Sequence, residues 1–249
     1  LPLIKDQGNL QKILKPKLAL KISPENTKDI SNEETRLDAN NIFNLNRISS
    51  SNTIEGGVSL AYGNDFTILN NKNNIEIFSL KLANNIRLNE NDDLPKTNQI
   101  GRKTSNFFGE ISYNPNDILK TKYHVSSKNN FTEVSYENLL AEISINNFVT
   151  TFDYLNENNT NEKNTYLKNK TTYNFNDRNN FSFSTRRNKK TNLTEYYNFI
   201  YQYKLDCLAA SIEYNKDYYD DRDIKPEENI FLKLTIIPFG ETSSPNLKN

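Results

Sequence analysis

The chain has 249 residues, with 31 basic and 31 acidic side chains and a hydrophobic content of 35%. The balanced charge argues against a nucleic-acid-binding protein, which usually carries a basic excess. No apolar run of about 18 residues predicts a transmembrane helix. The sequence starts at Leu1 and contains no Met, which predicts a fragment or a processed chain, and its first residues show no signal peptide.

The first 55 residues differ from the rest of the chain. Strand-like pieces, the clearest at 17–23, are separated by long polar stretches. This pattern predicts an early strand followed by a long loop, and it does not predict a separate domain.

From residue 56 onwards, apolar and polar residues alternate with a period of two, which is the pattern of half-buried β-strands. The expected strands are about 8–12 residues long. The alternating runs lie at 56–69, 74–88, 106–114, 117–127, 130–138, 141–155, 164–176, 179–190, 195–207, 208–219 and 229–240.

Clusters of Asn, Asp, Gly and Pro predict turns between these runs, because these residues supply turn geometry and positive φ. Roughly a dozen strands joined mostly by tight turns predict an antiparallel up-and-down meander. The turn clusters lie at 63–65, 70–74, 114–117, 128–130, 156–164 and 176–180.

Two architectures fit such a meander: a soluble sandwich or propeller, and a transmembrane β-barrel. Soluble strands average about 5–6 residues, whereas a membrane barrel needs about 9–11 residues per strand. The alternation puts Tyr, Phe, Leu and Ile on one face and Asn, Lys, Ser, Thr and Glu on the other. Long two-faced strands of this kind favour the barrel. Tyrosines near strand ends suit an interfacial aromatic girdle: Tyr154, Tyr166, Tyr196 and Tyr218.

Two groups of short motifs resemble the C-terminal barrel of the LptD family, also called organic solvent tolerance proteins. The strand-rich middle of the chain resembles that family in style only. The first group comprises Asp38–Asn41, Asn46–Arg47, Glu55–Gly57 and Tyr62–Gly63, and the second comprises Asp206–Leu208, Lys225–Glu227 and the closing strand "IFLKLTIIPFG".

The resemblance implies an all-β chain that forms part of a large transmembrane β-barrel in the bacterial outer membrane. Its implied organisation is an early strand and long loop over 1–55, consecutive barrel strands over 56–240 and a tail over 241–249. A sheet made of this portion alone is expected not to close, and an open edge cannot lie bare in lipid.

The resemblance also implies a role in lipopolysaccharide transport and insertion into the outer leaflet through a laterally opening barrel. The implied partners are lipopolysaccharide, outer-membrane lipid, an LptE-like lipoprotein in the lumen and an LptA-like periplasmic bridge, which would contact an N-terminal jellyroll domain. No cofactor, metal, catalysis or nucleic acid is expected. The alternative is a generic outer-membrane channel of the porin type.

A barrel enzyme such as a lipase would need His124, which is the only histidine, and no G-x-S-x-G motif is present. A structural role for His124 is therefore favoured. The acidic residues at 220–228 favour a solvated hairpin loop over a metal site, since they lack a calcium-loop spacing. The glycines at 56–57 predict a bulge or a close backbone approach.

Cys207 is the only cysteine. The alternation by itself favours a free cysteine on the apolar face. The resemblance implies instead a disulfide to a cysteine in the periplasmic N-terminal part of the protein, since the periplasm is oxidising. Family members often carry two adjacent cysteines here, and this chain carries one.

Two further features have a structural and a functional interpretation. Pro238 lacks an N–H group and could weaken the seam of a lateral gate, although a simple strand end is favoured. The basic run Arg186, Arg187, Lys189 and Lys190 could contact anionic lipid, although a solvated strand end and turn is favoured.

Overall fold

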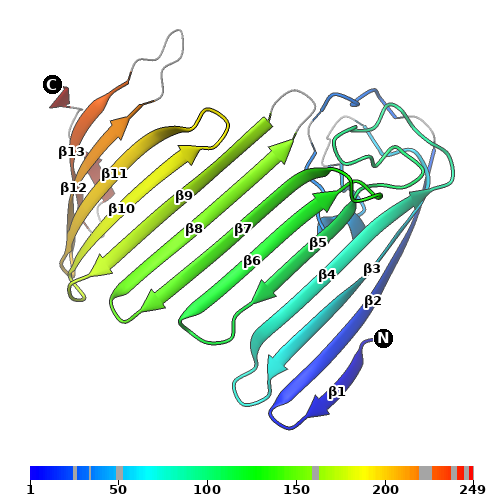
Figure 1. Cartoon of the computed structure of the whole chain (residues 1–249), viewed down its shortest axis with the longest axis horizontal. Coiled ribbons are helices and arrows are strands. Elements are labelled where there is room, and N and C mark those ends of the chain that lie inside the picture. Colours follow the sequence, from blue (N-terminus) through cyan, green and yellow to red (C-terminus); the bar gives the residue numbers. More distant parts are fainter. Residues whose placement is uncertain are drawn as a thin grey trace. The chain divides into compact units, whose positions relative to one another are not determined.

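The computed structural model describes residues 1–24, 27–33, 35–48, 53–158, 163–218, 226–236, 240–243 and 247–248. The strands follow one another in the order β1 to β14, each next to its neighbour in sequence, with β15 paired to β13 (Figure 1). The predicted all-β antiparallel meander is therefore confirmed. The described residues contain no helix with the length and apolar character of a membrane span.

The chain divides into two compact units. The first comprises residues 1–116, 120–139 and 155–163, and the second comprises 117–119, 140–154 and 164–249. The elements are β1 (Leu3–Gln7), β2 (Leu10–Ser23), the 3₁₀ turn η1 (Asn41–Phe43), β3 (Gly57–Asn70), β4 (Ile75–Arg87), β5 (Phe107–Tyr113), β6 (Leu119–Ser127), β7 (Val134–Ile145), β8 (Phe148–Asn158), β9 (Lys163–Asn174), β10 (Asn179–Asn188), β11 (Leu193–Lys204), β12 (Leu208–Asp217), β13 (Glu228–Ile236), β14 (Gly240–Ser243) and β15 (Leu247–Lys248).

In the first unit, one face of the β2–β3–β4 sheet is apolar and exposed. The register places Leu20 opposite Leu60, and Leu60 opposite Ile86. Leu18 and Ile22 extend this face along β2, and both side chains are exposed. Exposed apolar surface of this extent is typical of a face that meets another protein or a membrane.

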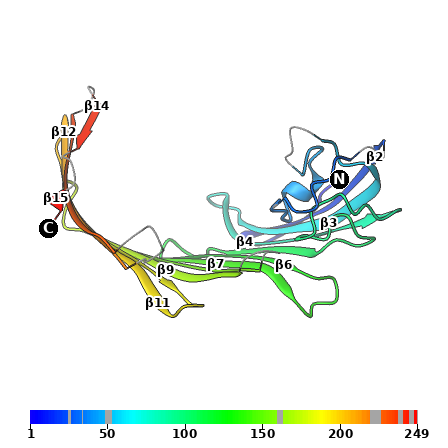
Figure 2. The same ribbon diagram turned by 90° about the horizontal axis from the view of Figure 1, so that it is seen from above.

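The opposite face of the same strands carries small and polar residues that are buried, among them Ser59, Ala61, Ala83 and Asn85. The described parts of two long connections cover this face: residues 24–56 between β2 and β3, and residues 88–106 between β4 and β5. Figure 2 shows η1 and the β2–β3 connection lying on one side of β3 and β4. The buried core lies between the connections and the sheet, and it comprises Ile30, Leu37, Ala39, Ile42, Ile48, Ala61, Ala83, Leu94, Ile100 and Phe108.

The edge of β2 is partly open. β1 pairs only with residues 10–14 of β2. From Lys15 to Ser23, β2 has a paired neighbour on its β3 side alone among the described residues. Pro16 lies at the start of this open edge, where its missing N–H group is tolerated.

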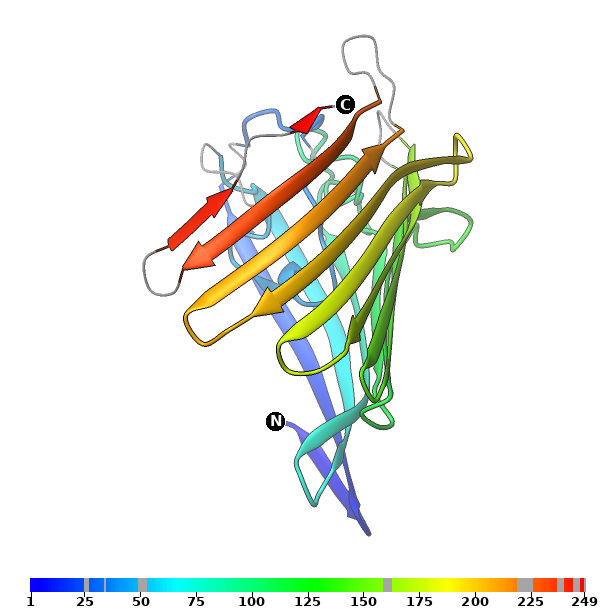
Figure 3. The same cartoon turned by 90° about the vertical axis from the view of Figure 1, so that its left-hand side faces the viewer.

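In the second unit, the strands β9 to β13 lie side by side (Figure 3), and their two faces carry different side chains. On one face, aromatic and aliphatic side chains stand opposite one another, and the Phe183 and Phe199 ring centroids are 4.7 Å apart. One exposed row of this face crosses five strands: Tyr173, Phe181, Tyr201, Ile212 and Leu232. The other face carries polar rows, one of which comprises Ser184, Asn198, Asn215 and Asn229.

At the start of the chain, the short connections 8–9 and 71–74 alternate with the long connections 24–56 and 88–106. Because successive strands of a meander are antiparallel, every second connection lies at the same end of its sheet. In the second unit, the short connections 175–178 and 205–207 therefore share one end, and 189–192 and 218–227 share the other. Several turns use left-handed backbone, which Gly and Asn adopt most readily: φ is +59° at Gly8, +58° at Asn74 and +50° at Asn146.

Two expectations about boundaries are wrong. Residues 63–65 lie inside β3 instead of forming a turn, because Gly63 serves packing and not chain reversal. The runs expected at 130–138 and 141–155 are in fact β7 (Val134–Ile145) and β8 (Phe148–Asn158). The chain reverses at Asn146–Asn147, where Asn146 has positive φ, and the pair Leu139–Leu140 that interrupts the alternation lies within β7.

Gly63 leaves no room for a side chain. A Cβ atom there would overlap the carbonyl oxygen of Leu82 on β4 and lie 3.0 Å from Cζ of Phe43 in η1. We expect Gly63→Ala to lower the free energy of unfolding by about 1–3 kcal/mol through overpacking. The midpoint of denaturant unfolding in detergent measures this change.

The matched control is Gly8→Asn in the β1–β2 turn. A Cβ atom at this position meets nothing within 4 Å, and Asn tolerates its φ of +59°. We expect little change in the midpoint. Equal destabilisation by both substitutions would contradict the packing role of Gly63.

Candidate functional site

The Asp-Ala-Asn-Asn motif folds as a turn that leads into η1. The Asp38 carboxylate accepts hydrogen bonds from the backbone N–H groups of Asn40, at 2.7 Å, and Asn41, at 2.8 Å. The Asn41 side-chain oxygen accepts in turn from the Asp38 N–H group at 2.9 Å. Such reciprocal bonds are typical of Asx turns. They direct Ile42 into the core, where it is buried.

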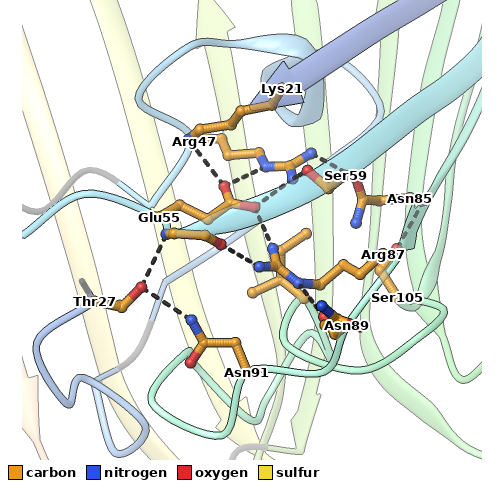
Figure 4. A network of polar contacts seen from close by, with 12 residues as sticks. Lys21, Thr27, Arg47, Glu55, Ser59, Asn85, Arg87, Asn89, Asn91 and Ser105 are labelled. Atoms are coloured by element: carbon orange, nitrogen blue, oxygen red, sulfur yellow. Dashed lines mark hydrogen bonds and ion pairs between the residues drawn. The ribbon is translucent and has the colours of Figure 1, made fainter. Parts of the chain in front are cut away.

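A buried ion-pair network joins the long connection to the sheet, and we call it the Glu55 network (Figure 4). Its members are Glu55, Arg47, Arg87 and Lys21. The Glu55 carboxylate accepts from Arg47 Nη2 at 2.6 Å and from Arg87 Nη1 at 2.7 Å. The side chains of Arg47, Glu55 and Arg87 are 2%, 1% and 1% exposed. Lys21 Nζ from β2 lies 3.1 Å from the same carboxylate.

Neutral groups satisfy the remaining donors of the two arginines. Arg47 donates to the Ile42 carbonyl at 3.0 Å and to Asn85 Oδ1 at 2.9 Å. Arg87 donates to the backbone carbonyl of Gly56. Three cations thus share one carboxylate, and backbone and amide oxygens complete their coordination, as buried charges require.

The two glycines that follow Glu55 belong to the same arrangement. Gly57 has a φ of +89°, and a Cβ atom there would lie 2.9 Å from Arg87 Nη2. The predicted close approach at 56–57 is therefore confirmed, with an arginine side chain as the approaching group. The sequence Glu55–Gly57 serves to bring a carboxylate and a bare backbone against Arg87.

A second carboxylate on the same face connects the Asp38–Asn41 turn to three strands. Glu110 of β5 accepts from Asn40 Nδ2 at 2.8 Å and lies 2.9 Å from Lys81 Nζ of β4. Lys122 and His124 of β6 lie 3.5 and 3.4 Å away. His124 therefore takes part in a polar cluster beneath the connection, and this accounts for it structurally.

The charge state of Glu55 follows from its neighbours. Burial alone would raise the pKa of Glu55, but the hydrogen bonds and charge of Arg47, assisted by Lys21, lower the pKa to about 2. The carboxylate is therefore ionised at every physiological pH, and the network is a permanent electrostatic contact.

Chemically, this site anchors chain segments. It contains charged pairs whose donors and acceptors are committed to one another, and no group of three or more His, Cys, Asp and Glu side chains among the described residues could hold a metal. Its members come from β2, from the 24–56 connection and from β4. The site fixes an inserted connection against the polar face of the sheet.

The other predicted site residues lie elsewhere. Cys207 is exposed in the short connection between β11 and β12, and it is a free thiol in this chain. β11 ends at Lys204 and β12 begins at Leu208, so Cys207 lies where the two alternating runs meet and not on the apolar face of a strand. Pro238 lies outside the described residues, as does most of the acidic cluster that starts at residue 220.

The basic run lies at the β10–β11 hairpin. Arg186 pairs with Glu195 and lies over the Tyr166 ring at 5.4 Å. Arg187 is exposed and donates to Asn192 Oδ1 at 2.7 Å. Lys189 and Lys190 are exposed in the turn. The four residues thus share one hairpin, but they are not equivalent, since Arg186 is already paired.

Sequence reasoning identified some members of the anchoring site through motifs and missed others. The structure brings together the motif residues Asp38–Asn41, Arg47, Glu55–Gly57 and Gly63. Their partners Lys21, Lys81, Arg87 and Glu110 were missed, because each occupies an ordinary polar position in an alternating strand. The one available signal was the position of Arg87: a charged residue at the end of a strand, directly next to a loop, can anchor that loop.

Comparison with known families gives one match. The family model for LptD, described as LPS transport system D, matches residues 3–169. The matched region contains both long connections and every member of the Glu55 network. A search among curated proteins found no match.

The Glu55 network makes a direct prediction about stability. Glu55→Gln leaves Arg47, Arg87 and Lys21 buried without a compensating charge, so we expect it to destabilise the first unit by about 3–5 kcal/mol at neutral pH. Denaturant unfolding and the rate of protease cleavage within 24–56 measure the change. The matched control Glu90→Gln breaks a half-exposed pair with Arg102 and should cost no more than about 1 kcal/mol.

The same variant reports on pH dependence. The folded pKa of Glu55 lies below its unfolded value near 4.5, so its stabilisation is complete above pH 4.5 and is lost as the pH falls toward 2. We expect the wild type and Glu55→Gln to converge in stability over that interval. A constant difference down to pH 2 would show that the carboxylate charge is not responsible.

Proposed function

The chain belongs to the LptD family, whose role is lipopolysaccharide transport, and we propose that it forms the wall of an outer-membrane β-barrel that inserts lipopolysaccharide into the outer leaflet. The observation that carries this proposal is the family match over residues 3–169. It encloses strands β1 to β8, the first part of β9 and both anchored connections. A transport protein of this family has no catalytic step to perform.

The two faces of each unit support the barrel. The exposed apolar rows, such as Tyr173, Phe181, Tyr201, Ile212 and Leu232, suit contact with lipid chains. The polar rows on the opposite face suit a wet lumen through which sugars pass. The partly open edge of β2 from Lys15 to Ser23 is where a further strand would pair, since lipid cannot satisfy free backbone groups.

Connection length supports an orientation. Outer-membrane barrels have short periplasmic turns and long external loops. In the first unit the long connections are 24–56 and 88–106, which we therefore assign to the external side. In the second unit the long connection is 218–227, and it lies at the same end as the hairpin turn 189–192. We therefore assign the basic hairpin 186–192 to the external side, and Cys207, in the connection 205–207 at the opposite end, to the periplasmic side.

The anchored connections give the lumen its shape. They fill the polar face of β3 and β4 with a packed core, so this part of the wall cannot carry a wide open pore. We propose that the saccharide passes beside them and that the acyl chains leave laterally into the bilayer. An LptE-like lipoprotein in the lumen and an LptA-like bridge reached through an N-terminal jellyroll remain the expected partners.

Two residue roles are part of the proposal. Arg187, Lys189 and Lys190, which are exposed at the external side, would contact phosphates of lipopolysaccharide or anionic headgroups. Arg186 is less suited to this role because Glu195 already neutralises it. A weakened seam at Pro238 stays a prediction, since that residue lies outside the described part of the chain.

Transport is tested by depleting the full-length protein in its host. We expect surface lipopolysaccharide, measured by labelling intact cells, to fall while lipopolysaccharide accumulates inside, because the insertion route is lost. Expression of the wild-type gene in the same strain should restore the display. Normal surface display with a loss of small-solute uptake would contradict transport and would favour the channel alternative.

We also propose that Cys207 forms a disulfide with the periplasmic N-terminal part of the full-length protein. Its exposure in a short turn on the assigned periplasmic side makes the thiol accessible to a partner. We expect a mobility shift on a gel when the full-length protein is reduced, and no shift for Cys207→Ser. An unchanged wild-type mobility would mean that the thiol is free.

A further inference from the structure

Four strands of the second unit carry a row of short polar side chains on their polar face. The register places Ser184 of β10 opposite Asn198 of β11, Asn198 opposite Asn215 of β12, and Asn215 opposite Asn229 of β13. Ser184 Oγ lies 3.4 Å from Asn198 Oδ1, and Asn198 Nδ2 donates to Asn215 Oδ1. A chain of hydrogen bonds thus runs along the first three members.

The chain of hydrogen bonds stops between the last two members. Asn215 Nδ2 has no hydrogen-bond partner among the described residues, and neither has Asn229 Oδ1. Asn229 is 6% exposed, and its Nδ2 group is directed to Glu227 at 3.4 Å. A buried amide oxygen without a donor costs about 1–3 kcal/mol, so it calls for a partner from outside the row.

An unbonded donor next to an unbonded acceptor matches one chemical group closely. A hydroxyl can accept one hydrogen bond and donate another. A single hydroxyl could therefore accept a hydrogen bond from Asn215 Nδ2 and donate one to Asn229 Oδ1. Two carbon-bound hydroxyls side by side, as in a sugar ring, can engage this pair and the neighbouring Asp217 carboxylate together. A small displacement of the Asn229 side chain would admit the donor.

The surroundings of the row form a hollow with aromatic borders. Its volume is about 370 Å³, within the range of roughly 300–1,000 Å³ typical of small-molecule sites. Tyr196 lies on one side of the row and Phe231 on the other, and both line the hollow. Aromatic rings offer flat apolar surfaces beside polar anchors, a combination that suits the apolar face of a sugar ring.

The charge of the hollow selects among saccharides. The one charged group among its described lining residues is the carboxylate of Asp217. A phosphate or carboxylate on the ligand would be repelled there, whereas neutral hydroxyls would donate to it.

We infer that the polar face of β10–β13 holds a binding site for an uncharged saccharide, with Asn215, Asn229 and Asp217 as its polar contacts and Tyr196 and Phe231 as its borders. The inference rests on the proposed function in that the saccharide belongs to the transported lipid. The site would hold the neutral part of the glycan during passage, away from its phosphorylated part.

The test is a binding measurement on the full-length protein in detergent micelles, by saturation-transfer difference NMR and titration calorimetry. The probes are three fractions of lipopolysaccharide from the host strain: its neutral oligosaccharide, its phosphorylated oligosaccharide and its lipid A. We expect Asn215→Leu, and Asn215→Leu combined with Asn229→Leu, to weaken binding of the neutral fraction at least about tenfold, because the amide contacts are lost. Binding of lipid A should not change.

The matched control is Gln202→Leu on the same face, where Gln202 Oε1 accepts from Asn180 Nδ2 at 3.1 Å within a satisfied pair. We expect this variant to bind the neutral fraction like the wild type. Heat-modifiable gel mobility checks that every variant is folded. Asn215 is only half-buried, so its single variant keeps the test valid if the double variant does not fold.

Three outcomes would overturn the inference: preference for the phosphorylated fraction, unchanged affinity in the Asn215 variants, or loss of a co-purifying protein partner while saccharide binding persists. Surface display of lipopolysaccharide on depletion is measured in the same strains. If the protein binds no saccharide but surface display of lipopolysaccharide still depends on it, the proposed site is wrong and the proposed transport function stands. Normal display after depletion would remove the transport function, whatever the saccharide result.

Discussion

The carboxylate of Glu55 is the contact on which the first unit depends. Two guanidinium groups and an ammonium group converge on it from β2, β4 and the 24–56 connection, and all but the ammonium are almost fully buried. Desolvation offsets much of the attraction in such a cluster, so its main effect is to define one arrangement rather than to add stability. An apolar patch would tolerate several positions of the connection. A carboxylate with fixed partners tolerates one, and the hydrophobic core around Ile42 and Phe108 then packs on a defined template.

Much of the fold could be predicted from the alternation of residues, because a period of two reports directly which face a side chain occupies. The order of strands followed, since tight turns force neighbours in sequence to pair. The anchoring site could be predicted only through its motifs. Arg87 and Glu110 look like ordinary polar residues of a strand, and their roles depend on contacts with residues 32 and 70 positions away. Gly63 illustrates the same limit: the chain is straight there, and the reason for glycine is the crowding by Phe43 and Leu82.

The two units use different chemistry on their polar faces. In the first, charged groups are buried and fully committed to one another, and the face is closed by chain segments. In the second, rows of neutral amides and hydroxyls line the polar face, and the buried Asn229 Oδ1 has no hydrogen-bond partner among the described residues. Committed charges hold a structure in place, whereas uncommitted neutral groups can exchange partners at small cost.

Many of the described asparagines occupy one of two kinds of place: left-handed turn positions such as Asn74, Asn146 and Asn192, or polar rows such as Asn198–Asn215. In both, the side chain is tolerated or useful, and in neither does it displace an apolar residue from a core. If the base composition of a genome shifts toward Asn codons, other residues at these positions can therefore be replaced by Asn without loss of the fold. The fold tolerates many substitutions, so sequence identity can fall quickly while the strand order and the few buried charges are retained.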